Sequence, residues 1–224
     1  MFCDKKELFF MFYFSTYKVH LYIDQHMFTG IITHQWQIIQ KDQWLFTLQK
    51  PTDLLLNIWQ SIAHDGACMT VTEITDETYS FFAMEESLSK TNFTQKMVGD
   101  RFNLELCVQA NQMLDGHIVT GHIDTTWTIS SVLDAEDGSR KLTITYDPQR
   151  DVNILPKGSI ALNGVSLTVV ETWSGRCTVR LIPLTQTLTN LWTVAIGSVV
   201  NIEFDMVGKY VLNYMQHAQK QQLT

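Results

Sequence analysis

Two short stretches of the chain place sulfur and hydroxyl groups where they could bind a flat polar ring. Cys68 and Thr70 form one pair and Ser166 and Thr168 the other, and in both stretches a glycine stands two residues before the first member. Because side chains alternate along a strand, each pair lies on one face. The glycine allows close backbone approach, and the thiol or hydroxyls can hydrogen-bond to ring substituents. The pattern suits a polar heterocycle; a small-residue strand inside a barrel core is the alternative.

A histidine-containing segment is the second candidate for chemistry. Residues 116–124 read Gly-His-Ile-Val-Thr-Gly-His-Ile-Asp and contain His117, His122 and Asp124. We predict no metal site, because this spacing matches no common ligand set and the cysteines lie elsewhere. A histidine between two domains is better suited to hydrogen bonding or proton transfer.

The first pattern belongs to an internal repeat. Residues 61–71 and 159–169 share Ser, Ile, Ala, Gly, Thr and Val at matched places, 98 positions apart. The same offset pairs Asn103 with Asn201 and Glu105 with Glu203. One register held over several segments predicts that a domain of about a hundred residues has been duplicated.

Composition narrows the class of protein. The chain has 224 residues, is 45% hydrophobic and carries a formal net charge of -7. No cluster of Lys and Arg that could bind nucleic acid is present. No apolar run reaches the length of a membrane-spanning helix, so we expect no membrane segment. The four cysteines form no CxxC pair, which favours a reduced, cytoplasmic protein.

Residues 1–26 differ from the rest of the chain. A basic start precedes a short aromatic run, and Met27 then opens the part that has the pattern of a domain. We interpret 1–26 as an upstream extension, which a misassigned start site would explain. A secretory signal is the alternative, but no small-residue cleavage site follows the apolar run.

Most of the chain after Met27 has the pattern of short strands. Strands are predicted at 30–39 and 44–48, and hairpins at 69–84, 127–146 and 166–182 with turns at 76–77, 137–138 and 174–175. Regular short strands predict an all-β fold of two barrels. The join between them is expected near residues 121–125.

The C-terminal residues change to a helical period. Val207, Tyr210, Val211, Tyr214 and Ala218 recur at helical spacing, so 207–221 is predicted to form an amphipathic α-helix. Its apolar stripe must be covered either by the chain's own barrels or by another subunit.

Several motifs together resemble the riboflavin synthase family (alpha-chain type). They are Met-Phe-Thr-Gly-Ile-Ile at 27–32, the repeated pair of strand motifs, the segment 116–124, Lys-Gly-Ser at 157–159, Ile-Pro-Leu-Thr at 182–185, and 197–205. Their order and distances extend the resemblance from Met27 to about Tyr210.

The resemblance implies two tandem six-stranded Greek-key β-barrels and a C-terminal α-helix, assembled as a homotrimer. The N-terminal lumazine-binding barrel would span 27–123, the C-terminal barrel 124–206 and the helix 207–224. The implied activity is that of a transferase: dismutation of two molecules of 6,7-dimethyl-8-ribityllumazine into riboflavin and 5-amino-6-ribitylaminouracil, the last step of riboflavin biosynthesis. No cofactor is implied, and association with lumazine synthase is a further partner that the resemblance allows.

The family's site residues transfer to matching positions of this sequence. Those associated with activity are Phe28, Cys68, His122, Ser166, Thr168 and Asp205. The N-terminal barrel would bind its ligand through Gly30, Ile31, Ile32, Ser61, Cys68, Met69, Thr70, Phe82, Ala83, Met84, Glu85, Glu86 and Ser87. The C-terminal barrel would use Gly121, His122, Ile123, Lys157, Ser166, Leu167, Thr168, Arg180, Leu181, Ile182, Pro183, Leu184 and Thr185. The active site is expected between the N-terminal barrel of one subunit and the C-terminal barrel of its neighbour.

A modest base is sufficient for such a reaction, because the carbanion of the lumazine C7 methyl group delocalises into the ring. A positioned base contributes roughly 10²–10⁴-fold, and holding two rings face to face about 7–11 kcal/mol. We hypothesise that His122 acts with Ser166 and Thr168 in proton transfer, and that Cys68 and Asp205 assist at the other ring.

Two rival functions stay open at this point. A lumazine- or flavin-binding protein without activity, such as the optical antenna proteins, would share the fold. An unrelated β-barrel interaction module would share neither ligand nor motifs. Between the repeats Cys68 stands for Ser166 and Cys107 for Asp205, so the two sites are alike in binding and unlike in chemistry, as a dismutase requires.

Overall fold

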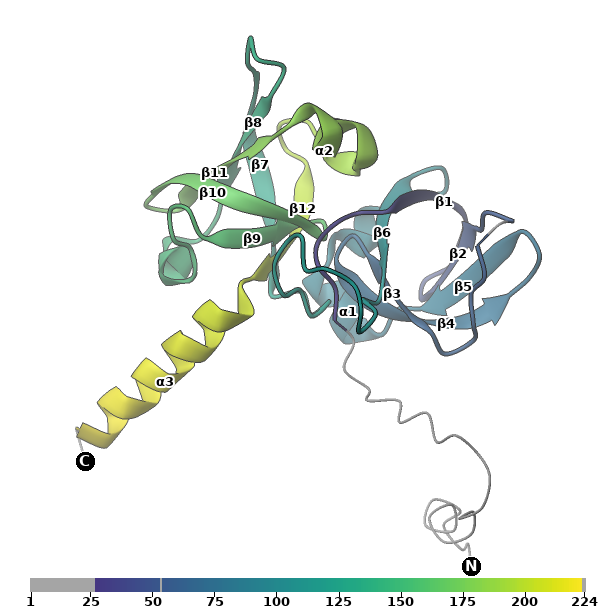
Figure 1. The fold of residues 1–224 in the computed structure, drawn as a ribbon, viewed down its shortest axis with the longest axis horizontal. Coiled ribbons are helices and arrows are strands. Elements are labelled where there is room, and N and C mark those ends of the chain that lie inside the picture. The colour runs from purple at the N-terminus through teal and green to yellow at the C-terminus, as the bar shows by residue number, and fades with distance from the viewer. Residues whose placement is uncertain (1–26, 53, 223–224) are drawn as a thin grey trace, which may run out of the picture.

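Two closed β-barrels and a C-terminal helix make up the part of the chain that the structure describes (Figure 1). The computed structural model describes residues 27–52 and 54–222. The predicted extension, residues 1–26, lies outside these ranges. The all-β duplicated fold expected from the sequence is confirmed.

The N-terminal barrel contains six antiparallel strands in the order β1-β2-β5-β4-β3-β6. They are β1 (His34–Lys41), β2 (Leu45–Gln49), β3 (Ser61–His64), β4 (Ala67–Ile74), β5 (Thr78–Phe82) and β6 (Arg101–Leu106). A short helix α1 (Glu85–Lys90) and a 3₁₀ turn η1 (Asn92–Gln95) connect β5 to β6.

The C-terminal barrel repeats this arrangement with the strand order β7-β8-β11-β10-β9-β12. Its strands are β7 (Thr125–Asp134), β8 (Arg140–Thr145), β9 (Ser159–Leu162), β10 (Val165–Trp173), β11 (Arg176–Leu181) and β12 (Val199–Phe204). Between them lie η2 (Pro148–Asn153), α2 (Pro183–Leu188) and η3 (Asn190–Trp192). Because α2 and η3 occupy the place of α1 and η1, the duplication includes the connections as well as the strands.

The three predicted hairpins are confirmed as β4–β5, β7–β8 and β10–β11. Several strand ends were wrong: the strand predicted from residue 30 begins at His34, and those predicted to end at 84 and 182 end at Phe82 and Leu181. The two short helices α1 and α2 were not predicted. Their sequences do favour helix starts, because Glu85 and Glu86 fill the first turn of α1 and Pro183 occupies the first position of α2.

Each barrel has its own core. The N-terminal core is aromatic: the rings of Phe46, Phe81, Phe93 and Phe102 are all fully buried and contact one another. The C-terminal core is mainly aliphatic, with residues such as Ile129, Leu142, Ile144 and Val179. The same strand alternation therefore fills two barrels with different side chains, which is possible because burial of apolar area, rather than residue identity, stabilises each core.

The two barrels contact each other at the turns that precede β4 and β10. A Cβ atom on Gly66 would lie 2.7 Å from the backbone nitrogen of Gly164, and the reverse distance is also 2.7 Å. Both glycines have positive φ, at 84° and 78°, so a side chain here would be both strained and obstructed.

Asparagine side chains join the barrels around this contact. Asn201 accepts a hydrogen bond from the Asn92 backbone N–H at 2.7 Å and donates to the Asp65 carbonyl at 2.9 Å. Asn103 makes the equivalent bonds to the Asn190 N–H at 2.6 Å and the Asn163 carbonyl at 3.0 Å. These side chains are buried, so their hydrogen bonds fix how one barrel lies on the other.

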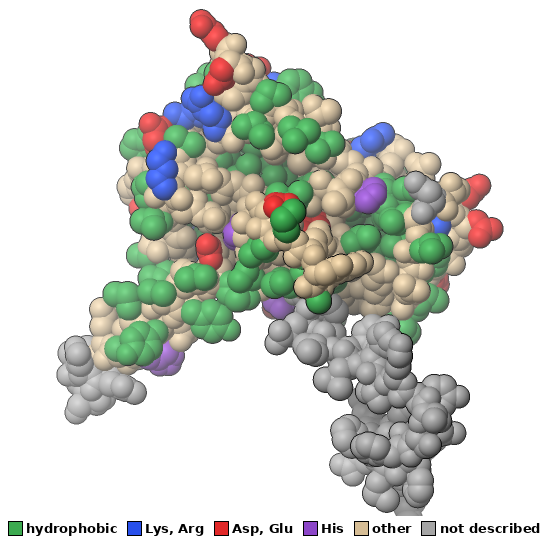
Figure 2. Space-filling model, viewed as in Figure 1, with side chains coloured by type: hydrophobic (Ala, Val, Ile, Leu, Met, Phe, Trp, Pro, Cys, Tyr) green, Lys and Arg blue, Asp and Glu red, His purple; other side chains and the backbone are tan. Residues whose placement is uncertain are grey.

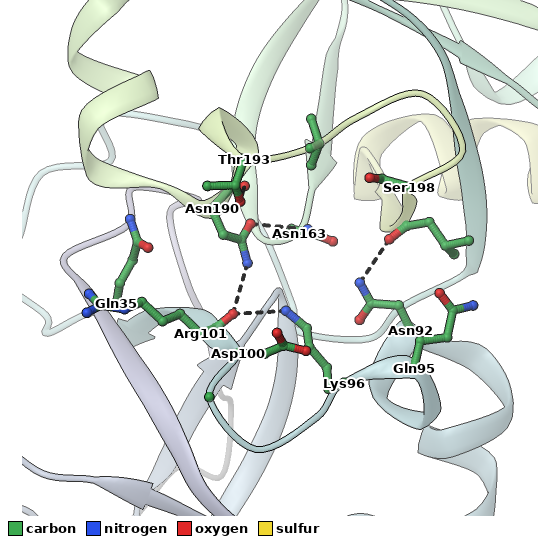
Figure 3. A pocket seen from close by; sticks show the side chains of 13 residues that line it. Gln35, Asn92, Gln95, Lys96, Asp100, Arg101, Asn163, Asn190, Thr193 and Ser198 are labelled. Carbon is green, nitrogen blue, oxygen red and sulfur yellow. Dashed lines mark hydrogen bonds between the residues drawn. The ribbon is translucent and has the colours of Figure 1, made fainter.

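A polar cavity of about 430 Å³ opens beside this joint (Figure 3). Lys96, in its lining, forms an ion pair with the buried carboxylate of Asp65 at 2.6 Å, and it donates to the Arg101 carbonyl at 2.9 Å. The equivalent of Asp65 in the other repeat is the neutral Asn163, so the joint is not chemically symmetric.

Helix α3 (Met206–Gln222) extends away from both barrels (Figure 1). It is tied at its start by the ion pair between Lys209 and Asp124 at 2.6 Å. Its predicted apolar stripe is exposed: Tyr210 and Tyr214 have 72% and 75% of their surface accessible, and Figure 2 shows hydrophobic side chains along the visible face. The chain's own barrels therefore do not cover this stripe. Among the described residues, no helix is long and apolar enough to cross a membrane.

We predict that Asn201→Ala lowers the free energy of unfolding, because it leaves the Asn92 N–H and the Asp65 carbonyl without their partner. The expected loss is roughly 1–3 kcal/mol for each buried group left unpaired. Equilibrium urea unfolding measures it. Asn57→Ala, at an exposed position, is the control and should stay within about 0.5 kcal/mol of the parent. Equal stability of the two variants would contradict the proposed role of the joint.

Candidate active site

Two segments cross between the barrels and build a site on each. The backbone of Phe28 pairs with that of Val119, which brings the segment before β1 alongside the segment before β7. Ile32 then packs into the core of the C-terminal barrel, and Ile123 packs against the core of the N-terminal barrel. The segment before β1 therefore contacts the C-terminal barrel before its strand joins the N-terminal barrel, and the segment before β7 does the opposite.

The first site lies at Ser166 on β10. The Ser166 N–H donates to the Gly30 carbonyl at 2.8 Å, and a Cβ atom on Gly30 would lie 2.6 Å from the Ser166 Cβ. Gly30 has φ of +76°, so only glycine suits both the conformation and the contact. Thr168 lies on the same outward face and is exposed, whereas Leu167 points into the barrel.

The second site is the same arrangement at Cys68 on β4. The Cys68 N–H donates to the Gly121 carbonyl at 2.8 Å, and a Cβ atom on Gly121 would lie 2.5 Å from the Cys68 Cβ. Met69 points into the barrel and Thr70 is exposed. In both copies, therefore, the predicted pair of polar side chains faces outward, and the alternative of a small-residue strand inside the core is wrong.

These contacts correct the predicted division of the site. Residues 30–32 were assigned to the N-terminal site with Cys68, but the structure places Gly30 against Ser166. Residues 121–123 were assigned to the C-terminal site, but Gly121 contacts Cys68. The exchange follows from the crossing of the two segments, which no local sequence pattern reveals.

A cavity of about 510 Å³ lies beside Cys68. It is partly open to solvent, and α1 forms one wall. Its lining includes the predicted residues Cys68, Met69, Met84, Glu86, Ser87, Gly121, His122 and Ile123, together with the unpredicted Ala67, Lys90 and Thr91. The predicted residues Phe82 and Ala83 do not line this cavity: Ala83 is fully buried, and Phe82 is half exposed and stacks on Trp44.

The remaining predicted residues of the C-terminal site lie around β10 and α2. Lys157 precedes β9 with φ of +70° and is exposed. Arg180 forms a surface ion pair with Asp137 at 3.4 Å, Leu181 is buried, and Ile182 and Leu184 are exposed. Residues 182–185 form the start of α2, the counterpart of the cavity wall at α1.

His117 belongs to the histidine segment that the sequence analysis considered for chemistry, but it was not among the predicted site residues. Its Nδ1 lies 2.7 Å from the Ser166 Oγ, and the ring is buried. Its Nε2 has no hydrogen-bond partner among the described residues. Burial lowers the pKa of His117, while the negative charge of Asp205 acts in the opposite direction. A neutral imidazole that accepts the serine proton could serve as a general base. His122 instead lines the Cys68 cavity, so within one chain it does not lie beside Ser166. Its role with Ser166 and Thr168 stays a prediction.

Three other predicted residues lie near the two candidate sites. Phe28 is fully buried between the barrels, where its ring limits the space at Gly121. The Asp205 carboxylate accepts a hydrogen bond from the Val207 N–H at 2.9 Å, which caps the start of α3. Ser61 is buried and pairs with Thr70 across β3 and β4.

The chain matches the model of the lumazine binding domain twice, over residues 29–107 and 120–205. The riboflavin synthase of Actinobacillus pleuropneumoniae is 36% identical over 194 residues, which cover 84% of this chain and 90% of that protein. That of Escherichia coli strain K12 is 36% identical over 185 residues, covering 80% and 87%. The riboflavin synthase of Bacillus subtilis is 34% identical over 197 residues, covering 86% and 91%.

Solved structures have the same fold. LumP complexed with riboflavin superposes with a TM-score of 0.72 at 25% identity, covering 78% of this chain and 97% of that one. LumP complexed with 6,7-dimethyl-8-(1'-D-ribityl) lumazine has a TM-score of 0.69 at 24% identity and the same coverage, a likeness of fold.

We predict that His117 titrates below the ordinary value of 6.5, because its burial disfavours the charged imidazole. Asp205→Asn should lower this pKa further, since the carboxylate stabilises the charged form, while asparagine preserves the helix cap. Nitrogen-15 NMR of the histidine rings against pH measures both values. A His117 pKa at or above 6.5, or a rise in the Asp205→Asn variant, would contradict the assignment.

Proposed function

Since the chain belongs to the riboflavin synthase family and carries the lumazine-binding domain twice, we propose that it transfers a four-carbon unit between two molecules of 6,7-dimethyl-8-ribityllumazine. One molecule becomes riboflavin and the other 5-amino-6-ribitylaminouracil. The observation that carries the proposal is the pair of sites at Cys68 and Ser166. They have the same backbone contacts and different reactive groups. Two copies of one substrate require such similarity in binding, and the roles of donor and acceptor require the difference in chemistry.

The geometry supports a base at the Ser166 site. His117 and Ser166 form a hydrogen-bonded pair, and the burial of His117 keeps its ring neutral and able to accept a proton. We assign to this pair the removal of a proton from the C7 methyl group of the lumazine bound there. The carbanion delocalises into the ring, so a base of modest strength is adequate.

The Cys68 site holds the second lumazine with different groups. His122 is exposed along its cavity, and Cys107 takes the sequence position that Asp205 has in the other repeat. Burial raises the pKa of Cys107 to about 11, so its thiol is neutral near neutral pH. This site therefore lacks the carboxylate that acts on His117, which supports distinct roles for the two bound molecules.

A homotrimer would complete the active site. The reaction needs two lumazine rings face to face, and we expect the N-terminal barrel of one subunit to lie opposite the C-terminal barrel of the next. The exposed stripe of α3 supports assembly, because an apolar helix face that no part of its own chain covers is suited to a subunit interface. Association with lumazine synthase and a cytoplasmic location stay predictions.

A non-catalytic antenna protein is the second candidate, since LumP binds riboflavin on the same fold. The greater identity to riboflavin synthases, 36% against 25%, favours the enzyme. The hydrogen-bonded His117–Ser166 pair supports it as well, because ligand binding alone needs no base.

We predict that the protein made from Met27 forms riboflavin and the aminouracil in equal amounts from 6,7-dimethyl-8-ribityllumazine. Riboflavin fluorescence and chromatography of the products measure this. His117→Gln should lower kcat by roughly 10²-fold or more, the usual contribution of a positioned base. His34→Gln, a histidine outside the site, should keep the parent rate. Tight lumazine binding without turnover by the unchanged protein would favour the antenna function instead.

We predict that charge on the α3 stripe prevents assembly. Tyr210→Glu combined with Tyr214→Glu should convert trimers to monomers in sedimentation velocity, because carboxylates cannot be buried at an apolar interface. Turnover should fall with the trimer if each site needs two subunits. Gln216→Glu with Gln219→Glu adds the same charge away from the stripe and should leave the trimer intact. A trimer that survives the tyrosine changes would exclude α3 as the interface.

A further inference from the structure

Two buried glutamates occupy equivalent places in the two barrels and have no part in the chemistry described above. Glu105 lies on β6 opposite Ala63, and Glu203 lies on β12 opposite Ala161. Both alanines belong to the small cluster between the barrels rather than to either barrel core. The glutamates are 4% and 1% exposed, so the structure maintains two carboxylates out of water at the joint.

Each carboxylate holds one of the crossing segments. Glu105 Oε1 accepts hydrogen bonds from the Thr29 N–H at 2.6 Å and the Thr29 hydroxyl at 2.7 Å, and its Oε2 accepts from the Gly30 N–H at 2.9 Å. Glu203 makes the same three bonds to the Thr120 N–H, the Thr120 hydroxyl and the Gly121 N–H, at 2.7, 2.7 and 3.1 Å. A neutral amide side chain does not offer this set, because only a carboxylate accepts at both oxygens and donates at neither.

The loops held in this way are those that meet the opposite barrel's site. The carbonyl of Gly30 accepts from the N–H of Ser166, and the carbonyl of Gly121 accepts from the N–H of Cys68. Glu105 therefore belongs to the N-terminal barrel, whereas the loop that it holds forms part of the C-terminal site. Glu203 belongs to the C-terminal barrel, and the loop that it holds forms part of the N-terminal site.

We propose that Glu105 and Glu203 are positioning residues with crossed effects: Glu105 fixes the ligand site at Ser166, and Glu203 fixes the ligand site at Cys68. The proposal rests on the proposed function for the identity of the ligand. Burial of a charge is costly unless it is fully hydrogen-bonded, and here three donors converge on each carboxylate. Such a contact holds backbone at a fixed place beside a ligand, which a barrel core residue would not do.

The test replaces each glutamate by glutamine, which has nearly the same shape but presents an NH₂ group to one of the donors. To read one site at a time, each change is made in two backgrounds. Thr70→Arg obstructs the Cys68 site and Thr168→Arg obstructs the Ser166 site, and both threonines are exposed, so the arginine can be accommodated. Binding of 6,7-dimethyl-8-ribityllumazine to the whole chain is followed by calorimetry.

With the Cys68 site obstructed, Glu105→Gln should weaken lumazine binding roughly tenfold, while Glu203→Gln leaves it within about twofold. With the Ser166 site obstructed, the pattern should reverse. Glu77→Gln and Glu136→Gln, which change exposed carboxylates of the same barrels, should alter neither site. A loss confined to the site on the mutated barrel itself, or equal losses at both sites, would overturn the crossed assignment.

Amide hydrogen exchange tests the same assignment without a ligand. Glu105→Gln should speed exchange at Gly30 and Ser166, and Glu203→Gln should speed exchange at Gly121 and Cys68. Unchanged exchange at these amides would overturn the proposal. Absence of riboflavin formation with the crossed binding pattern intact would refute only the catalytic function. If a glutamine variant does not fold, Thr29→Val and Thr120→Val remove a single hydroxyl from each contact and should give the same crossed pattern at smaller amplitude.

Discussion

The contact between the turns at Gly66 and Gly164 is the constraint on which the rest of the structure depends. Two backbones approach so closely that no side chain fits, and the side chains of Asn103 and Asn201 fix the relative orientation of the barrels around them. An approach this close leaves no apolar layer between the barrels at that point. Hydrogen-bond geometry therefore sets the joint, and it tolerates less sliding than packed hydrocarbon would.

The joint in turn decides where the two sites lie. With the barrels fixed back to back, the segments before β1 and β7 must pass one another, and they pair as Phe28 with Val119. Each then reaches the first polar residue of the opposite barrel's motif strand. Duplication therefore did more than add a second binding barrel, because each copy contributes a loop to the site of the other.

The two sites also show how a symmetric framework can hold unequal chemistry. The backbone contacts at Cys68 and Ser166 match in kind and in length, at 2.8 Å each. Around them, the side chains differ. The buried, neutral His117 lies beside Ser166 and near Asp205, whereas Cys68 carries a thiol and shares its cavity with the exposed His122. Similar backbone donors and acceptors suit one ligand, and differing side chains suit different steps of a reaction on that ligand.

Local patterns in the sequence determined the strands, the three hairpin turns, the terminal helix and the repeat, because alternation, turn residues and helical spacing depend on neighbouring residues. The repeated Cys68–Thr70 and Ser166–Thr168 pairs predicted both candidate sites. The repeat also contained Glu105 and Glu203 at matched places, and a charged residue recurring within a strand was the signal of their buried role. Only the tertiary structure decided that Gly30 meets Ser166, that Gly121 meets Cys68, and that His117 lies within hydrogen-bond distance of Ser166. Those contacts join residues that are far apart in the chain and meet only at the joint between the barrels. The hydrogen bond between Glu105 and Thr29 spans 76 positions, so the residue pattern around neither of them predicts it.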